Sequence, residues 1–123
     1  MSGIDIQEQR HIRARFPAVG PRVHRADDDS RLGNLVNLTT EGLLLMGADP
    51  VAVGKELPLC IRWPGTDGEN QEIHFQARSR WCQTLGNPAF HITGFAISRI
   101  TTEELDRVLR LICTFGFQEA VTD

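Results

Sequence analysis

Short stretches in which apolar and polar residues alternate constrain the fold of this chain most strongly. The clearest one spans residues 57–63, where Leu57, Leu59, Ile61 and Trp63 alternate with Pro58, Cys60 and Arg62. A second one spans residues 71–83, where Ile73, Phe75, Ala77 and Trp81 share one face and His74, Gln76, Arg78 and Arg80 share the other. Because successive side chains of a strand point to opposite faces of its sheet, this period predicts half-buried β-strands.

Further strands are expected on both sides of these two. They comprise a short strand that begins at Val23 and strands over residues 32–38, 42–46 and 89–98. The segments between strands are rich in Gly, Pro and Asp, and they include an exposed acidic turn at Asp27–Asp29 and a tight turn at Thr39–Gly42. Several short strands separated by such turns predict a mainly β fold, a barrel or a sandwich.

One helix is expected near the C-terminus, over about residues 101–116. Thr101 and Glu104 have the spacing of a capping box, in which each side chain bonds the other residue's backbone N–H. An apolar stripe of Leu105, Val108, Leu109 and Ile112 follows at helical spacing. Gly116 is expected to end the helix.

The first 17 residues differ in character from the rest. They are polar and basic, show no strand alternation, and are followed by the chain breakers Pro17, Gly20 and Pro21. We expect residues 1–17 to form a mobile basic arm and residues 18–123 to form one domain with the helix at its end. A chain of 123 residues is long enough to bury a core of its own.

Composition and charge exclude several classes of protein. The net charge of -3 argues against binding of a nucleic-acid polymer. No apolar run approaches the ~20 residues of a membrane helix, and the N-terminus does not resemble a secretory signal, so a cytoplasmic protein without membrane contact is expected. Twelve of the thirteen basic residues are Arg, and six of them lie within the first 31 positions. A local Arg cluster on an acidic protein favours a small anionic ligand.

The sequence offers little for catalysis or metal binding. It has no Gly-rich phosphate loop, no GxSxG motif and no evident pair of nucleophile and base. The three cysteines are widely spaced without a CxxC motif, and the four histidines have no metal-binding spacing. A solvated turn is the favoured interpretation of Asp27–Asp29 over a cation site. We therefore expect neither an enzyme, nor a metal, nor a cofactor.

Two segments together indicate a ligand. Arg10, Arg13 and Arg15 on the arm can clamp phosphates, stack on bases, or bond the O6 and N7 atoms of guanine. Residues 37–42, which read Asn-Leu-Thr-Thr-Glu-Gly, add an amide, a hydroxyl and a glycine between two strands. Taken separately, these segments are typical of a solvated arm and of a β-turn.

In this order the two segments resemble the PilZ domain family, whose members bind the bacterial second messenger cyclic di-GMP. The family pattern is RxxxR, then about 20–30 residues, then [D/N]xSxxG, and here Asn37 follows Arg15 by 22 positions. The segment 77–81, the segment Thr93-Gly94-Phe95 and the C-terminal helix match the family as well, so that the resemblance covers residues 8–117. It implies a six-stranded antiparallel β-barrel with a C-terminal α-helix.

The resemblance also implies roles for individual residues. Arg10 and Arg15 would contact phosphates or guanine edges, and Arg13 would add charge or stack. Asn37 would bond a guanine Watson–Crick edge, Thr39 would bond a guanine or phosphate oxygen, and Gly42 would allow close approach. Trp81 is a candidate for stacking on the ligand. Its shared face with Ile73 and Phe75 favours packing in the core instead.

Two departures from the family pattern bear on function. His11 stands where the first Arg is expected, with Arg10 one residue early, and Thr39 replaces Ser while keeping the hydroxyl. The resemblance implies a non-enzymatic receptor whose arm rearranges on binding and signals to a downstream protein. PilZ-like domains often pair, which allows a homodimer.

Two alternatives remain open. The first is a PilZ-like adaptor that no longer binds cyclic di-GMP. The presence of His11 where the family pattern has its first Arg favours this alternative. The second is a small hydrolase, which the absent pair of nucleophile and base disfavours.

Overall fold

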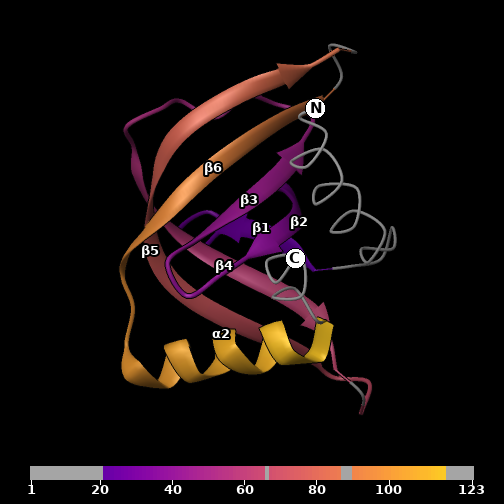
Figure 1. The fold of residues 1–123 in the computed structure, drawn as a ribbon. Coiled ribbons are helices and arrows are strands. Elements are labelled where there is room, and N and C mark those ends of the chain that lie inside the picture. The colour runs from indigo at the N-terminus through magenta and orange to yellow at the C-terminus, as the bar shows by residue number, and fades with distance from the viewer. Residues whose placement is uncertain (1–20, 66, 87–89, 116–123) are drawn as a thin grey trace, which may run out of the picture.

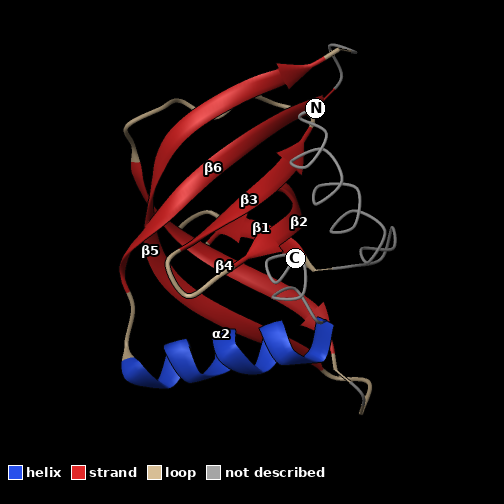
Figure 2. Ribbon diagram, in the orientation of Figure 1, coloured by secondary structure: helices blue, strands red, loops and turns tan. Residues whose placement is uncertain are grey.

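Six antiparallel strands form in the computed structural model, which describes residues 21–65, 67–86 and 90–115. The strands are β1 (Arg22–Arg25), β2 (Arg31–Leu38), β3 (Gly42–Gly47), β4 (Glu56–Pro64), β5 (Asn70–Leu85) and β6 (Phe90–Arg99). They close into a barrel in the order β1-β2-β3-β6-β5-β4 (Figures 1 and 2). The expected barrel with a C-terminal helix is confirmed. The arm of residues 1–17 and Gly116 lie outside the described residues.

The shortest strand closes the barrel. β1 pairs with β2 on one side and with β4 on the other, and Val23 is fully buried between them. Val23 lies opposite Ile61, which is also fully buried. β1 therefore leaves neither β2 nor β4 with an unpaired edge at this point.

The interior is filled by the inward-facing residues of the alternating strands. β4 and β5 follow the predicted period, because Leu59 and Ile61 lie opposite Phe75 and Ile73, and all four are buried. Leu35, Leu38, Leu43, Leu45 and Phe95 supply the rest of this part of the core. The polar residues between them lie on the outer face of the barrel, where their side chains can contact a ligand.

The helix α2 (Thr102–Phe115) lies across one end of the barrel (Figure 1). Its buried residues are Val108, Leu111 and Ile112, which join the barrel core. Leu109 was expected on the apolar stripe but is 45% exposed. At 100° per residue, Leu109 lies at the margin of the face centred on Val108 and Ile112, whereas Leu111 lies within it.

The start of α2 differs from a complete capping box. The hydroxyl of Thr101 accepts a hydrogen bond from the Glu104 N–H at 3.2 Å, as expected. The Glu104 carboxylate, however, accepts the backbone N–H of His74 in β5 at 3.0 Å. Glu104 therefore connects the helix to the barrel. No helix in the described part of the chain has the length and apolarity needed to cross a membrane.

Candidate ligand-binding site

The turn between β2 and β3 is built around the hydroxyl of Thr39. Its oxygen accepts hydrogen bonds from the backbone N–H groups of Glu41 and Gly42, each at 3.1 Å. The Thr39 N–H donates to the Gly42 carbonyl at 2.9 Å, which closes the predicted turn. The hydroxyl is thus part of the turn itself, and the exposed Thr39 side chain stands at the surface beside β3.

A bulge in β2 turns Asn37 to the outer face of the barrel. Leu35 and Leu38 are both buried although they are three positions apart, and the register of β2 with β3 shifts between Leu35 and Asn37. Without that extra residue, Asn37 would point inward with Leu35. The side-chain oxygen Oδ1 of Asn37 accepts the N–H of Leu38 at 2.9 Å. The side-chain NH₂ group of Asn37 has no partner among the described residues, so it can donate to a ligand.

A second bulge, in β5, turns Trp81 outward. The register with β6 shifts between Ser79, which is buried, and Trp81, which is 40% exposed. The expectation that Trp81 packs in the core with Ile73 and Phe75 is therefore wrong, because the bulge ends the strict alternation on which that expectation depended.

The two bulges bring Asn37 and Trp81 into one row across four strands. The row runs through the direct cross-strand pairs Asn37–Leu44, Leu44–Gly94 and Gly94–Trp81. Gly94 leaves room for the indole, since a Cβ atom at that position would lie 2.5 Å from the ring of Trp81. The indole therefore rests directly against the backbone of β6.

A surface pocket of about 280 Å³ lies along this row. Its lining residues are Asn37, Thr39, Gly42, Leu43, Leu44, Arg80, Trp81, Gly94 and Phe95. Four of the residues expected to bind a ligand, Asn37, Thr39, Gly42 and Trp81, thus meet at one place. Arg10, Arg13 and Arg15 lie outside the described residues.

Arg80 is a member of the pocket that sequence reasoning did not single out. Its side chain is exposed and forms no ion pair with the residues that the structure describes. Arg78, two residues earlier, is paired with Glu56 and with the Gly54 carbonyl. Arg80 is therefore the cation of this strand that is available to an anionic ligand. Its position directly before Trp81 was the signal that could have drawn attention to it.

The close approach of β3 and β6 requires a glycine at position 42. A Cβ atom there would lie 2.4 Å from the backbone oxygen of Phe95, across the β3–β6 ladder. Any side chain would force these two strands apart. The glycine of the motif therefore keeps β3 close to β6, and it opens the floor of the pocket at the same time.

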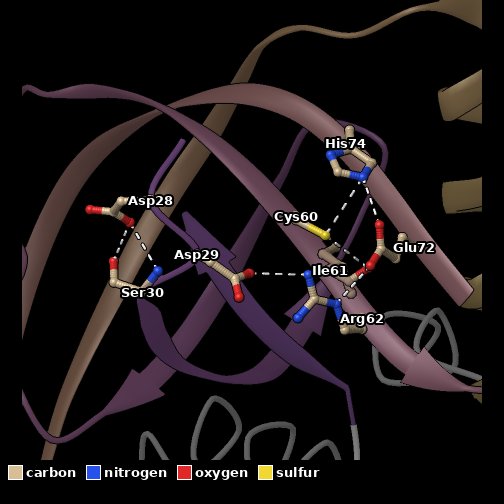
Figure 3. A network of polar contacts seen from close by, with 8 residues as sticks. All are labelled: Asp28, Asp29, Ser30, Cys60, Ile61, Arg62, Glu72 and His74. Atoms are coloured by element: carbon tan, nitrogen blue, oxygen red, sulfur yellow. Dashed lines mark hydrogen bonds and ion pairs between the residues drawn. The ribbon is translucent and has the colours of Figure 1, made fainter. Parts of the chain in front are cut away.

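A separate polar network occupies the outer face of β4 and β5 (Figure 3). Arg62 bonds Asp29 at 3.2 Å and Glu72 at 2.8 Å, and Glu72 is bonded in turn to the ring of His74 at 3.0 Å. The bond with His74, together with that from Arg62, holds the pKa of Glu72 below its usual value, against the opposing effect of partial burial. Burial, followed by the charge of Glu72, raises the pKa of the Cys60 thiol. All three cysteines are unbridged.

The Asp27–Asp29 turn binds its own neighbours. Asp27 is paired with Arg25 at 2.8 Å, and Asp28 accepts the N–H and the hydroxyl of Ser30 at 2.9 and 2.7 Å. Asp29 bonds Arg62. Arg25 also lies 3.9 Å from Asp28, so all three carboxylates are engaged by neighbouring side chains or backbone, as in a solvated turn.

Comparison with known proteins identifies a family and solved structures with a similar fold. The sequence profile described as "PilZ domain" matches residues 7–113. The Bacillus subtilis inhibitor of motility (MotI/DgrA) aligns with a TM-score of 0.64 and 18% identity, over 80% of this chain and 47% of that protein. The PilZ domain of CeSA from a cellulose-synthesizing bacterium aligns with a TM-score of 0.51 and 23% identity, over 82% of this chain and 96% of that domain. No curated protein sequence matches the chain significantly.

Proposed function

Because the chain belongs to the PilZ domain family, we propose that it is a non-enzymatic receptor for cyclic di-GMP. The ligand binds in the pocket beside the β2–β3 turn, and the basic arm of residues 1–17 folds over it. The observation that carries the proposal is that Trp81, which is distant in the sequence, lines one pocket together with Asn37, Thr39 and Gly42 of the β2–β3 turn segment.

The pocket offers groups that suit both halves of this ligand. The free amide N–H groups of Asn37 donate to a guanine edge, and the indole of Trp81 presents a face for stacking. The guanidinium of Arg80 pairs with a phosphate or with the O6 and N7 atoms of guanine. Together these groups bind a ligand that carries both bases and phosphates, without chemistry on it.

The arginines of the arm are within reach of the pocket. The Pro21 carbonyl accepts the N–H of Leu35 at 3.0 Å. Pro21, where the arm enters the barrel, therefore lies beside β2 only two positions from Asn37. The six Cα–Cα steps from Arg15 to Pro21 span at most about 20 Å when the chain is extended. Arg15 can therefore contact a ligand in the pocket, while Arg10 and Arg13 reach its far side. Movement of the arm onto the ligand changes the surface seen by a downstream partner protein.

Calorimetric titration tests this proposal. Cyclic di-GMP is titrated into the protein at low and physiological salt, with GMP and cyclic GMP as control ligands. We expect saturable binding of cyclic di-GMP alone, weakened by salt. Arg15→Ala and Asn37→Ala should each weaken it, and loss of the charge-assisted contacts of Arg15 corresponds to about 10–100-fold.

Arg110→Ala is the matched control. Arg110 is exposed on α2 and paired only with Asp106 at 2.8 Å among the described residues, and it lines no part of the pocket beside the turn. Its removal should leave the affinity unchanged. An Arg15→Ala protein that binds as tightly as the wild type would contradict the proposed role of the arm.

A second candidate function is an adaptor that binds a protein rather than the nucleotide. His11 in the place of the first Arg of the motif favours it. So does the exposed apolar pair formed by Leu85 and Phe90, which lie opposite each other at the ends of β5 and β6 and are 37% and 47% exposed. A folded protein that gives neither heat nor a thermal shift with cyclic di-GMP would favour this second function.

A further inference from the structure

Three potential metal ligands lie together on the outer face of β4 and β5, away from the pocket beside the β2–β3 turn. The Sγ atom of Cys60 lies 3.8 Å from Nε2 of His74, and that nitrogen lies 3.0 Å from Oε1 of Glu72 (Figure 3). The three atoms are all within 4.8 Å of one another. None of these residues lines the pocket beside the turn.

The barrel itself creates this cluster. Cys60 and His74 are direct partners in the β4–β5 ladder. Their neighbours Ile61 and Ile73 point into the core, so Cys60 and His74 point outward on the same face. Glu72 precedes His74 by two positions and shares that face. The sequence spacing of a metal motif is absent because the donors come from two different strands.

The distances suit a tetrahedral cation with sulfur, nitrogen and oxygen ligands. Bonds of about 2.3 Å from zinc to sulfur and about 2.0–2.1 Å to nitrogen or oxygen place the ligand atoms of such a site about 3.3–3.6 Å apart. The separations of Nε2 of His74 from the other two ligand atoms, 3.0 and 3.8 Å, lie on either side of this range, and the third separation, between Cys60 and Glu72, is within 4.8 Å. Small side-chain rotations therefore bring all three atoms to a common centre.

The surrounding groups support that geometry. Arg62 bonds the Oε2 atom of Glu72 at 2.8 Å, which orients the carboxylate with Oε1 toward His74. This is the arrangement of an outer-shell partner that fixes a metal ligand. The positive charge of Arg62 is offset by Asp29 at 3.2 Å, and the carboxylate of Glu104 contacts the backbone of His74. A bound cation therefore does not meet an unbalanced positive charge.

His24 lies beside the cluster on β1 and is not one of its three ligands. It lies opposite Cys60 on the other side of β4, so that His24, Cys60 and His74 form a row across β1, β4 and β5. Within the described residues, the Nδ1 atom of His24 is buried and has no hydrogen-bond partner. Buried nitrogens without a partner are uncommon and call for an explanation, such as an ion.

We propose that Cys60, Glu72 and His74 form a binding site for a divalent cation of the zinc class. Sγ of Cys60, Oε1 of Glu72 and Nε2 of His74 are the ligands. The cation takes the place of two protons, that of the Cys60 thiol and that on Nε2 of His74, which bonds Glu72 in the absence of the cation. The thiol proton passes to solvent, and the imidazole stays neutral with its remaining proton on Nδ1. The site is independent of the nucleotide pocket.

Cobalt spectroscopy tests the site on the full chain. The protein is stripped with a chelator under reducing conditions and titrated with Co²⁺, whose thiolate complexes show a charge-transfer band in the near ultraviolet. We expect this band at one equivalent and its loss on addition of Zn²⁺. Wild-type protein that shows no such band would overturn the proposal.

Variants identify the ligands. Cys60→Ala should abolish the band, and His74→Gln should weaken Zn²⁺ binding about 10-fold or more. The double variant Cys82→Ala/Cys113→Ala retains Cys60 as its single thiol and should keep the band, which guards against a Cys60 variant that fails to fold. The control variant is His91→Gln, because the His91 ring bonds Thr84 on β5 and lies outside the cluster. A band that disappears in the double variant would also overturn the proposal.

Discussion

Trp81 and Gly94 act as one unit of the candidate site. The indole is 40% exposed, yet it lies so close to Gly94 that no side chain fits between them. The glycine therefore fixes the depth at which the aromatic face stands in the pocket. A stacking surface needs this kind of support, because a freely rotating indole loses conformational entropy when it binds.

Replacing Gly94 with Ala should displace the indole. Because the ring is partly exposed, it can swing toward solvent, so we expect the free energy of unfolding to change by no more than about 1 kcal/mol. Trp81 fluorescence, measured in a Trp63→Phe background, should shift to longer wavelength, and the affinity for cyclic di-GMP should fall. Gly86→Ala is the control, since a Cβ atom there meets nothing within 4 Å. An unchanged emission spectrum would contradict the contact.

At the scale of elements, a hydrogen bond between Glu104 of α2 and the backbone of β5 connects the helix to the barrel. Glu104 thus bonds a strand and not the start of its own helix. The N–H of His74 points away from β4 and donates to the carboxylate of Glu104 in the first turn of α2. The β5–β6 ladder extends only as far as the pair Gln76–Arg99, so β6 does not reach His74. The carboxylate thus takes over from β6 where the β5–β6 ladder has ended.

Glu104→Ala should therefore destabilise the protein by about 1–2 kcal/mol, toward the lower end of the roughly 1.5–3 kcal/mol of hydrogen bonds to charged groups, because this bond is exposed to solvent. Glu104→Gln keeps an acceptor oxygen and should cost less. Glu103→Ala is the matched control, because Glu103 is also an acidic residue of the first turn. It loses the same favourable interaction with the helix dipole. Urea unfolding of the three variants measures the difference, and equal losses for Glu103 and Glu104 would show that the contact to β5 contributes nothing.

The whole molecule is a barrel whose one end is covered by a helix. Leu111 is 1% exposed and belongs to the same core as the strands. The helix is therefore part of the barrel's core and not an appendage to it. The pocket beside the β2–β3 turn lies on the side wall, among β2, β3, β5 and β6.

Leu111→Ala should cost about 2–5 kcal/mol of stability, because it leaves a cavity between helix and barrel. Leu109→Ala, two residues earlier and exposed, should change stability by no more than about 0.5 kcal/mol. Chemical denaturation gives both values. At a temperature where the Leu111 variant remains folded, its affinity for cyclic di-GMP should match the wild type, since no residue of α2 lines the pocket. A large loss of affinity in the folded variant would indicate that α2 shapes the site.

The sequence by itself determined the strands, the helix and the turn at Thr39–Gly42. These follow from local physics: a period of two for strands, a period near 3.6 for the helix, and the preference of Thr and Gly for tight turns. The residues of that turn and the arginines before it also sufficed to indicate the family, which the profile match confirms.

Only the tertiary structure decided which side chains share a surface. Bulges at Asn37 and Trp81 reverse the face that simple alternation assigns to them, and a bulge depends on the pairing of two strands rather than on either sequence alone. Arg80 keeps the outer face that alternation assigns to it, and it lines the pocket because β5 pairs with β6, and β6 with β3. Cys60 and His74 are 14 positions apart and meet because β4 and β5 pair in that register. Such contacts between distant residues exist only once the barrel has closed.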